Sequence, residues 1–303
     1  MSTANVARHP FGIAIQKRER ISLAASVRRS EWVIAGFMIY AAALALILPV
    51  APQVQARTVI VNLAIVLGYA VLIRFASVKP ILALSVARDW LPLALMLLAY
   101  REMGWFAMPH HGHALEAHWV VWDSAVLHGG LKAAIEAFGP LLPGILEISY
   151  ALVYTLAPFS VAMLYVYGRR AQVDRFLFVF ALGVLLCYAQ FPFWPSEPPR
   201  TVFFGQDFPA YNTVFRQFNW WMLSLCGIHT SVFPSAHVAG AFSAAFGVWR
   251  AMPRPKWVVR ALLVMAVLIA TATVYGRYHY LADAMAGLLM AILALAVARR
   301  LRL

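Results

Sequence analysis

Long runs of apolar residues, separated by short polar connections, dominate the pattern of this chain. A helix needs about 20 such residues to cross the hydrocarbon core of a bilayer, so runs near that length predict membrane-spanning helices. We expect such helices at about 32–48, 58–73, 90–107, 145–167, 176–194, 236–250, 258–275 and 280–298. The predicted fold class is an all-α polytopic membrane protein, a helical bundle of about eight transmembrane spans.

The composition strengthens this prediction. Of the 303 residues, 63% are hydrophobic and only 12% are charged, which is far too apolar for a soluble domain of this length. The two cysteines, Cys187 and Cys226, follow neither a disulfide nor a metal-binding pattern. No tandem repeat or low-complexity tract interrupts the series of apolar segments.

The basic residues carry topological information. The net charge of +13 first suggests a nucleic-acid partner, but the cations stand between apolar runs, as orientation signals do. Of the 25 basic residues, 18 fall on alternate connections, six of them within residues 1–31. The positive-inside rule then predicts that both termini are cytoplasmic and that the connections between these basic ones face the periplasm, the cell exterior or a lumen. We expect the bilayer as a partner and no nucleic acid.

These segments divide the chain into five parts. A 31-residue lead is long for a cleaved signal peptide, so the first span is expected to be retained. The expected parts are a basic cytoplasmic segment (1–31), N-terminal transmembrane helices (32–107), an outer interfacial segment (108–144), a catalytic helical core (145–298) and a basic tail (299–303).

Two histidines stand at the beginning of long apolar segments on the predicted outer side. The first follows Phe233 in the sequence Pro234-Ser235-Ala236-His237. Proline is favoured in the first turn of a helix and serine caps helices, so His237 is expected in the first turn. Free backbone N–H groups and the helix dipole make that position favourable for an anion.

The second histidine has a carboxylate partner. His279 and Asp283 are four residues apart, so on a helix they share a face and can hydrogen-bond. A carboxylate that accepts from one ring nitrogen fixes the tautomer and leaves the other nitrogen as a nucleophile. Charged and ionisable side chains within membrane spans are costly, so their presence there indicates function. Two such helix starts predict a phosphate pocket between His237 and His279.

Three motifs resemble those of a known family. Pro234-Ser235-Ala236-His237 and the later run from His279 to Asp283 are similar to the second and third motifs of the type 2 phosphatidic acid phosphatase superfamily. The run from Pro195 to Arg200 resembles the first motif in the proline-rich form of the inositol phosphorylceramide synthase branch. The resemblance covers roughly residues 115–298.

This resemblance implies a mechanism. His279 would take the phosphoryl group, Asp283 would orient it, and His237 would protonate the leaving oxygen. The phosphate oxygens would be held by cations and backbone N–H groups, namely Arg200, Arg277 and those around Ser235 and Ala236. Because cations and helix ends stabilise the charge, neither a metal nor another cofactor is expected.

The chain departs from the phosphatase pattern at two positions. Thr273 stands where that pattern has an arginine, and Phe193 where it has a lysine. These losses favour the transferase branch. The predicted function is therefore transfer of a lipid phosphate or head group at the non-cytoplasmic face, with a phospholipid or a polyprenyl- or sphingolipid-type lipid as substrate. The alternatives are a lipid phosphate phosphatase with water as acceptor, and a non-catalytic transporter or scaffold.

Three further segments carry weaker expectations. The run from His110 to His113 has no second ligand cluster at metal-site spacing, so we expect an interfacial segment there and no metal. Phe215 to Leu225 is expected to form an amphipathic lid that rests in the head-group layer. Residues 80–89 are expected as a surface-lying helix before the third span.

Overall fold

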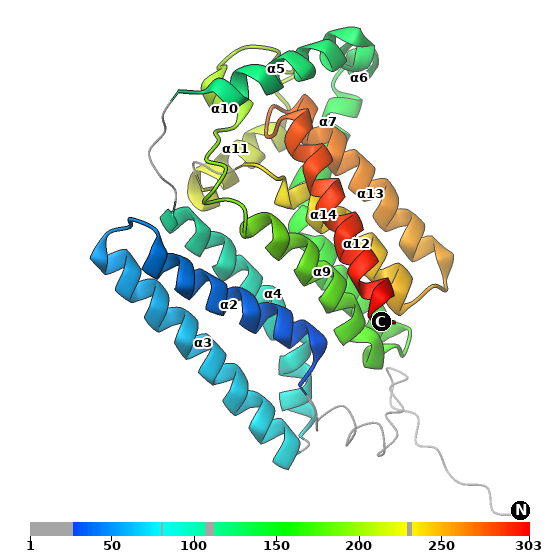
Figure 1. The fold of residues 1–303 in the computed structure, drawn as a ribbon. Coiled ribbons are helices and arrows are strands. Elements are labelled where there is room, and N and C mark those ends of the chain that lie inside the picture. The colour runs from blue at the N-terminus through cyan, green and yellow to red at the C-terminus, as the bar shows by residue number, and fades with distance from the viewer. Residues whose placement is uncertain (1–26, 80, 107–111, 229–231) are drawn as a thin grey trace, which may run out of the picture.

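The computed structural model describes residues 27–79, 81–106, 112–228 and 232–303. These residues form helices and no strand (Figure 1). The helices are α2 (Arg29–Ile47), α3 (Pro52–Val78), α4 (Leu82–Met103), α5 (Ala114–Val126), α6 (Lys132–Glu136), α7 (Leu141–Ala151), α8 (Leu156–Val166), α9 (Val173–Tyr188), α10 (Pro199–Val202), α11 (Val214–Cys226), α12 (Ala236–Ala251), α13 (Lys256–Tyr275) and α14 (Leu281–Arg300).

The expected all-helical membrane fold is confirmed. Within the described residues, seven helical segments are long and apolar enough to cross a bilayer, and three of them combine a helix with a neighbouring short helical turn or helix. The remaining expected span, 236–250, is α12, a helix of only 16 residues. The total of eight spans therefore stays a prediction.

Helix α12 lies at the centre of the bundle and packs against α9, α13 and α14 (Figure 1). Small residues make this close packing possible. A Cβ atom at Gly287 of α14 would lie 2.3 Å from the carbonyl oxygen of Ser235. A Cβ atom at Gly247 of α12 would lie 3.0 Å from the carbonyl oxygen of Phe176. Gly287 thus lets the backbone of α14 contact the chain at the start of α12, and Gly247 lets α12 approach the backbone of α9.

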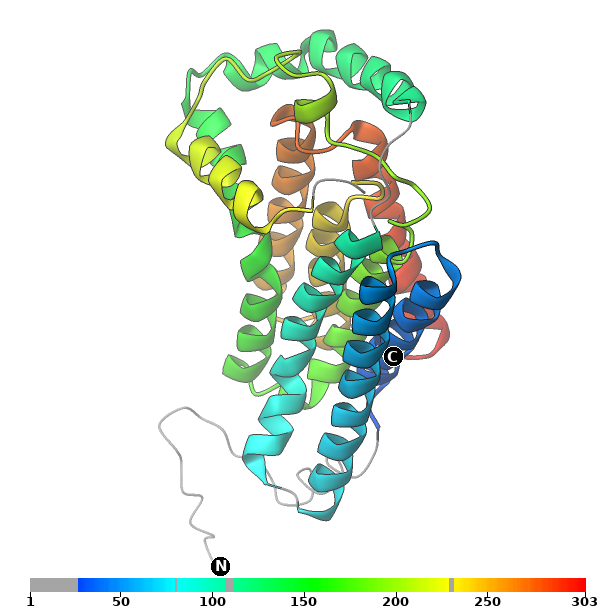
Figure 2. The ribbon, with the colours of Figure 1, turned by 90° about the vertical axis from the view of Figure 1, so that its left-hand side faces the viewer.

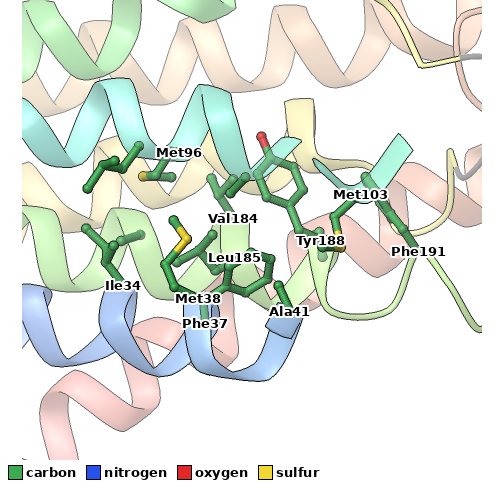
Figure 3. Packing of buried hydrophobic residues seen from close by; sticks show 14 of the residues in the cluster. Ile34, Phe37, Met38, Ala41, Met96, Met103, Val184, Leu185, Tyr188 and Phe191 are labelled. Atoms are coloured by element: carbon green, nitrogen blue, oxygen red, sulfur yellow. The ribbon is translucent and has the colours of Figure 1, made fainter. Parts of the chain in front are cut away.

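The N-terminal helices α2, α3 and α4 lie along one flank of this central bundle (Figure 2). Figure 3 shows Phe37 and Met38 of α2 meeting Leu185 of α9, with Met96 of α4 on the other side. The side chain of Met38 is fully buried. This apolar cluster joins the first three helices to the rest of the molecule.

The expected surface helix over 80–89 is wrong. Residues 82–89 form the beginning of the long helix α4, and Arg88 and Asp89 are buried. Asp89 accepts hydrogen bonds from Arg28 at 2.6 Å and from Arg170 at 2.8 Å, while Arg88 pairs with a carboxylate of α2. Burying these charges is possible because each meets an opposite charge from a different element.

Helices α5, α6, α10 and α11 form an end cap at the opposite end of the bundle from the C-terminus (Figure 1). The expected lid is the helix α11, whose outer face exposes Phe218 and Trp221. His110 and His111 lie outside the described residues. Among the residues that the structure describes, no group of three His, Cys, Asp or Glu side chains is arranged to hold a metal ion.

Candidate active site

The two motif histidines meet below the end cap. Ser235 caps α12 by accepting a hydrogen bond from the backbone N–H of Val238, so His237 lies in the first helical turn. The Nδ1 atom of His237 lies 3.3 Å from the Nε2 atom of His279. The structure therefore brings together two histidines that are 42 residues apart in the chain.

Asp283 lies behind His279 in the first turn of α14. Its Oδ2 atom is 3.3 Å from Nδ1 of His279 and accepts the backbone N–H of Tyr280 at 2.9 Å. The backbone carbonyl of Asp283 accepts the N–H of Ser235 at 3.0 Å. One residue thus orients His279 and joins the starts of α12 and α14.

The surroundings of His279 decide its protonation. Burial and, to a smaller extent, the positive charge of Arg200 lower the pKa of His279 to about 3. The imidazole is therefore neutral near pH 7. With its Nδ1–H donated to Asp283, its Nε2 atom carries a lone pair on the side that faces His237.

Arg200 reaches the same place from α10. Its backbone N–H donates to the carbonyl of Arg277 at 3.2 Å, and its Nη1 atom donates to the carbonyl of Tyr278 at 3.3 Å. A cavity of about 40 Å³ is lined by Arg200, His237 and His279 together with Ala236. Burial lowers the pKa of the Arg200 guanidinium, and no carboxylate contacts it among the described residues.

Arg277 is placed differently from Arg200. Its guanidinium is fully buried, donates from Nη1 to Asp123 at 2.5 Å, and is not part of the cavity lining. Its Nε and Nη2 atoms have no hydrogen-bond partner among the described residues. The structure thus gathers His237, His279 and Arg200 around the cavity, whereas Arg277 points into the end cap.

The sequence did not assign to the site two tyrosines that contact His237, nor Glu147, which contacts the neighbour of His279. The ring of Tyr150 stacks on His237 with centroids 5.0 Å apart, and the hydroxyl of Tyr154 lies 3.3 Å from Nε2 of His237. Glu147 accepts from Tyr278, the neighbour of His279, at 2.6 Å. A tyrosine in an apolar helix resembles a lipid-facing residue, but the cost of a carboxylate there was a usable signal for Glu147.

A second, larger cavity opens beside the first. It has a volume of about 380 Å³ and lies between α4, α8, α9 and α12. Most of its lining is apolar, and Tyr100, Tyr154 and His237 are among the members that carry polar groups. Tyr100, Ala236 and His237 also line the smaller cavity, so the two spaces share a boundary. An apolar chain in the larger cavity would place its polar end at the histidines.

Comparison with known proteins finds a family match that covers the residues of the site. The model of the PAP2 superfamily matches residues 120–297, which include all the motif residues described above. A PA-phosphatase related-family protein of Dictyostelium discoideum is 27% identical over 129 residues, which is 41% of this chain and 21% of that protein. The match thus spans about a fifth of the length of this relative. No solved structure matches the chain.

Proposed function

Because the chain belongs to the PAP2 superfamily, we propose that it is a multi-pass membrane enzyme that cleaves a lipid phosphate ester through a phosphohistidine at His279. The observation that carries this proposal is the 3.3 Å approach of the two histidines, with Asp283 behind His279. The proposed site lies where the small cavity lined by Arg200, His237 and His279 meets a large apolar cavity.

The first step transfers the phosphoryl group to the protein. The Nε2 lone pair of His279 attacks phosphorus, and a P–N bond forms as the bond to the lipid oxygen breaks. His237, in its protonated form, gives a proton to that oxygen, so the lipid leaves as an alcohol. Asp283 accepts the Nδ1–H of His279 and stabilises the positive charge that develops on the ring.

The second step regenerates the enzyme. His237, now neutral, takes a proton from water while the water oxygen attacks phosphorus. The P–N bond breaks, inorganic phosphate leaves, and His279 recovers its lone pair. The direct contact between His237 and His279 is replaced by phosphate during this cycle, so both rings face the reacting atom from opposite sides.

The negative oxygens have two sources of stabilisation. Arg200 lines the cavity and offers a planar guanidinium, which suits bidentate contact with phosphate. The backbone N–H groups at the start of α12, around Ala236, supply the positive end of a helix dipole. Both are fixed before substrate binds, as electrostatic stabilisation of a transition state requires.

The larger cavity supports a membrane lipid as substrate. Its apolar walls between α4 and α8 match a hydrocarbon chain, and His237 belongs to its lining. The Dictyostelium relative is named as a PA-phosphatase related-family protein, and the likeness to it supports water as the acceptor here.

A second candidate function is head-group transfer to a hydroxyl acceptor. Thr273 is buried and donates its hydroxyl to the carbonyl of Ala270, and Phe193 is 55% exposed. The two positions where the phosphatase pattern places cations therefore contribute none to the cavity. A site with fewer cations favours the transferase branch that the proline-rich motif resembles.

The decisive experiment is product analysis with the purified protein in lipid nanodiscs. Phosphatidic acid and a panel of other phospholipids are supplied with and without hydroxylated acceptors, and products are identified by mass spectrometry. Free phosphate identifies a hydrolase, and a lipid with a new head group identifies a transferase. His279→Ala should abolish either activity, by more than about 10³-fold.

The matched control is His128→Ala, which removes an exposed histidine of the same end of the molecule. This variant should keep wild-type turnover. Ordinary activity in His279→Ala would remove the nucleophile assignment. Absence of any product from the wild type across the whole panel would remove the proposed function.

A further inference from the structure

We propose that Asp123 is a positioning residue that fixes His279 by holding the chain on both sides of it. The inference rests on the proposed function of His279. Asp123 belongs to α5 of the end cap and lies 154 residues before Arg277 in the sequence, so its role is visible only in three dimensions. We call residues 276–281, between α13 and α14, the nucleophile loop.

The two oxygens of Asp123 contact the two ends of this loop. Oδ2 accepts a hydrogen bond from Nη1 of Arg277 at 2.5 Å, and Oδ1 accepts the backbone N–H of Leu281 at 2.7 Å. Arg277 is two residues before His279 and Leu281 is two residues after it. One carboxylate therefore brackets the nucleophile.

Each contact meets a need of the local structure. Leu281 is the first residue of α14, and the first N–H groups of a helix have no partner within it. Arg277 has a backbone φ of 63°, a left-handed conformation that residues other than glycine seldom adopt. Such conformations persist where surrounding contacts enforce them. The ion pair with Asp123 is one such contact, beside the hydrogen bond from the backbone N–H of Arg277 to the carbonyl of Val274 at 3.1 Å.

The pair is buried at a cost that indicates a specific role. The side chains of Asp123 and Arg277 are both 0% exposed. Buried ion pairs are weak contributors to stability, because desolvation offsets most of their attraction. Their fixed geometry is what this pair contributes. The carbonyl of Arg277 also accepts the backbone N–H of Arg200 at 3.2 Å. The Asp123–Arg277 pair therefore also helps to position Arg200, the proposed phosphate ligand.

The competing assignment makes Arg277 a direct phosphate ligand, acting independently of Asp123. Its unpaired Nε and Nη2 atoms would then reach the substrate. The two assignments differ in what the variants should show. If Arg277 only holds the loop, its loss should lower kcat, and the loss of Asp123 as well should lower kcat no further. If Arg277 binds phosphate directly, its loss should raise KM whether or not Asp123 is present.

The test compares Asp123→Asn with Asp207→Asn. Asp207 also ties α5 to a loop, by accepting from Ser124 at 3.0 Å and contacting His128 at 2.7 Å, but among the described residues it makes no hydrogen bond to the nucleophile loop. Asp123→Asn keeps the side-chain shape and should lower kcat about 10- to 100-fold with KM changed less than about threefold. Asp207→Asn should stay within about twofold of wild type.

A double-mutant cycle separates anchor from ligand. Arg277→Gln should lower kcat as Asp123→Asn does, and the double variant should be no worse than the more damaged single variant. Additive losses, or a rise of KM in Arg277→Gln alone, would overturn the anchor and favour the ligand.

Hydrogen exchange provides a readout that needs no activity. Asp123→Asn should speed amide exchange in the peptide that spans residues 276–283, with the rest of the protein unchanged, whereas Asp207→Asn should not. Because exchange is measured without substrate, this result stands even if the wild type proves to have no phosphatase or transferase activity. Unchanged exchange in a folded Asp123→Asn protein would refute the proposal.

Discussion

Burial and neighbouring charges set the protonation states of His279 and Asp123. His279 stays neutral because burial and the charge of Arg200 lower its pKa to about 3. Asp123 behaves in the opposite way, since burial raises its pKa to about 6, against the lowering effects of the Leu281 N–H and Arg277. Between pH 7 and 8, His279 is therefore unprotonated, while Asp123 is largely ionised and paired with Arg277.

This ordering predicts the acid side of the pH profile. As the pH falls through about 6, Asp123 takes up a proton and loses its ion pair with Arg277, so kcat should fall while His279 is still neutral. The folded protein holds the Asp123 proton more tightly than the unfolded chain, so the contribution of this group to folding stability grows as the pH falls from about 6 to 4. Activity and this stability term move in opposite directions.

The measurement is kcat against pH for the wild type and Asp123→Asn with the same lipid. The variant should lack the descent near pH 6, because its amide does not titrate there. The substrate phosphate titrates identically in both proteins, so it does not produce a difference between them. A shared descent at the same pH would assign it to the substrate or to another residue.

Arg200 supports a second prediction at this scale. Arg200→Ala should lower kcat/KM about 10²-fold, because it removes the charged side chain that lines the small cavity. Arg200→Lys should recover part of this loss, since lysine restores the charge without the planar fork. Arg101→Ala is the control, as Arg101 is exposed and donates to the carbonyl of Cys226 outside that cavity. Equal kinetics in Arg200→Ala and wild type would leave the proline-rich segment a structural role only.

Whether the sequence predicts a residue's role depends on how far along the chain that residue lies from the residues it contacts. His237, His279, Asp283 and Arg200 stand in short motifs whose spacing implies their chemistry, and the structure places them together. The contact between Asp123 and the nucleophile loop has no local pattern, because a helix of the end cap supplies it. Arg277 accordingly looked like a second phosphate ligand from its position in the sequence alone.

Among the helices, α11 connects the surface of the bundle to the site. Its buried face presents Arg216 and Asn219 to Glu147 of α7, at 2.9 Å and 2.8 Å. The hydroxyl of Tyr278 donates to the same carboxylate at 2.6 Å. Burial and the charge of Glu147 raise the pKa of Tyr278 well above its ordinary value, so this hydroxyl keeps the proton that it donates. Glu147 therefore ties α11 to the neighbour of His279.

Loosening this tie should weaken catalysis. The Nδ2 atom of Asn219 donates hydrogen bonds to the backbone carbonyl and to Oε2 of Glu147. Asn219→Ala removes both bonds and should lower kcat about 3- to 10-fold with little change in KM. Gln217→Ala is the control, since Gln217 is exposed on the same helix. Steady-state kinetics of both variants in nanodiscs provide the measurement. If the two variants prove equal, α11 does not communicate with the nucleophile loop.

The helices were predictable where apolar periodicity dominates and less so where charges are buried. The long runs gave the spans and the small residues gave the close contact of α12 with α14, seen at Gly287. The beginning of α4 was misjudged because Arg88 and Asp89 look like surface residues until their partners on α2 and after α8 are known. Ion pairs between different helices cannot be predicted from the sequence of one helix alone.

In the molecule as a whole, basic connections and candidate chemistry occupy opposite ends. Arg29 donates to the carbonyl of Leu301 at 3.0 Å, and Arg175 donates to the carbonyl of Arg250 at 3.4 Å, so these four positions share one end. Asp89 joins Arg28 and Arg170 at that end as well. The nucleophile loop and the end cap are at the other end (Figure 1). The alternation of cations seen in the sequence is thus a division in space.

This division predicts the orientation in the membrane. Positive connections remain on the cytoplasmic side, so the site should face the periplasm, the cell exterior or a lumen. Residues 29 and 301 are in contact, so the chain between them crosses the bilayer an even number of times if the bundle is embedded. With the seven long apolar segments among the described residues, α12 would then bring the number of spans to eight. The chain offers a native reporter, because Cys226 is exposed at the end of α11 and Cys187 is buried.

A membrane-impermeant maleimide should therefore label Cys226 in intact cells or spheroplasts if the chain is in the plasma membrane, and a reporter fused after Leu303 should read as cytoplasmic. Cys226→Ser should lose the label, which controls for reaction at Cys187. Labelling only after permeabilisation, together with a non-cytoplasmic reporter, would invert the protein and put its site within reach of cytosolic phosphate donors. A labelled Cys226 with a non-cytoplasmic reporter would instead mean an odd number of crossings, and α12 would then be a buried helix that does not span the bilayer.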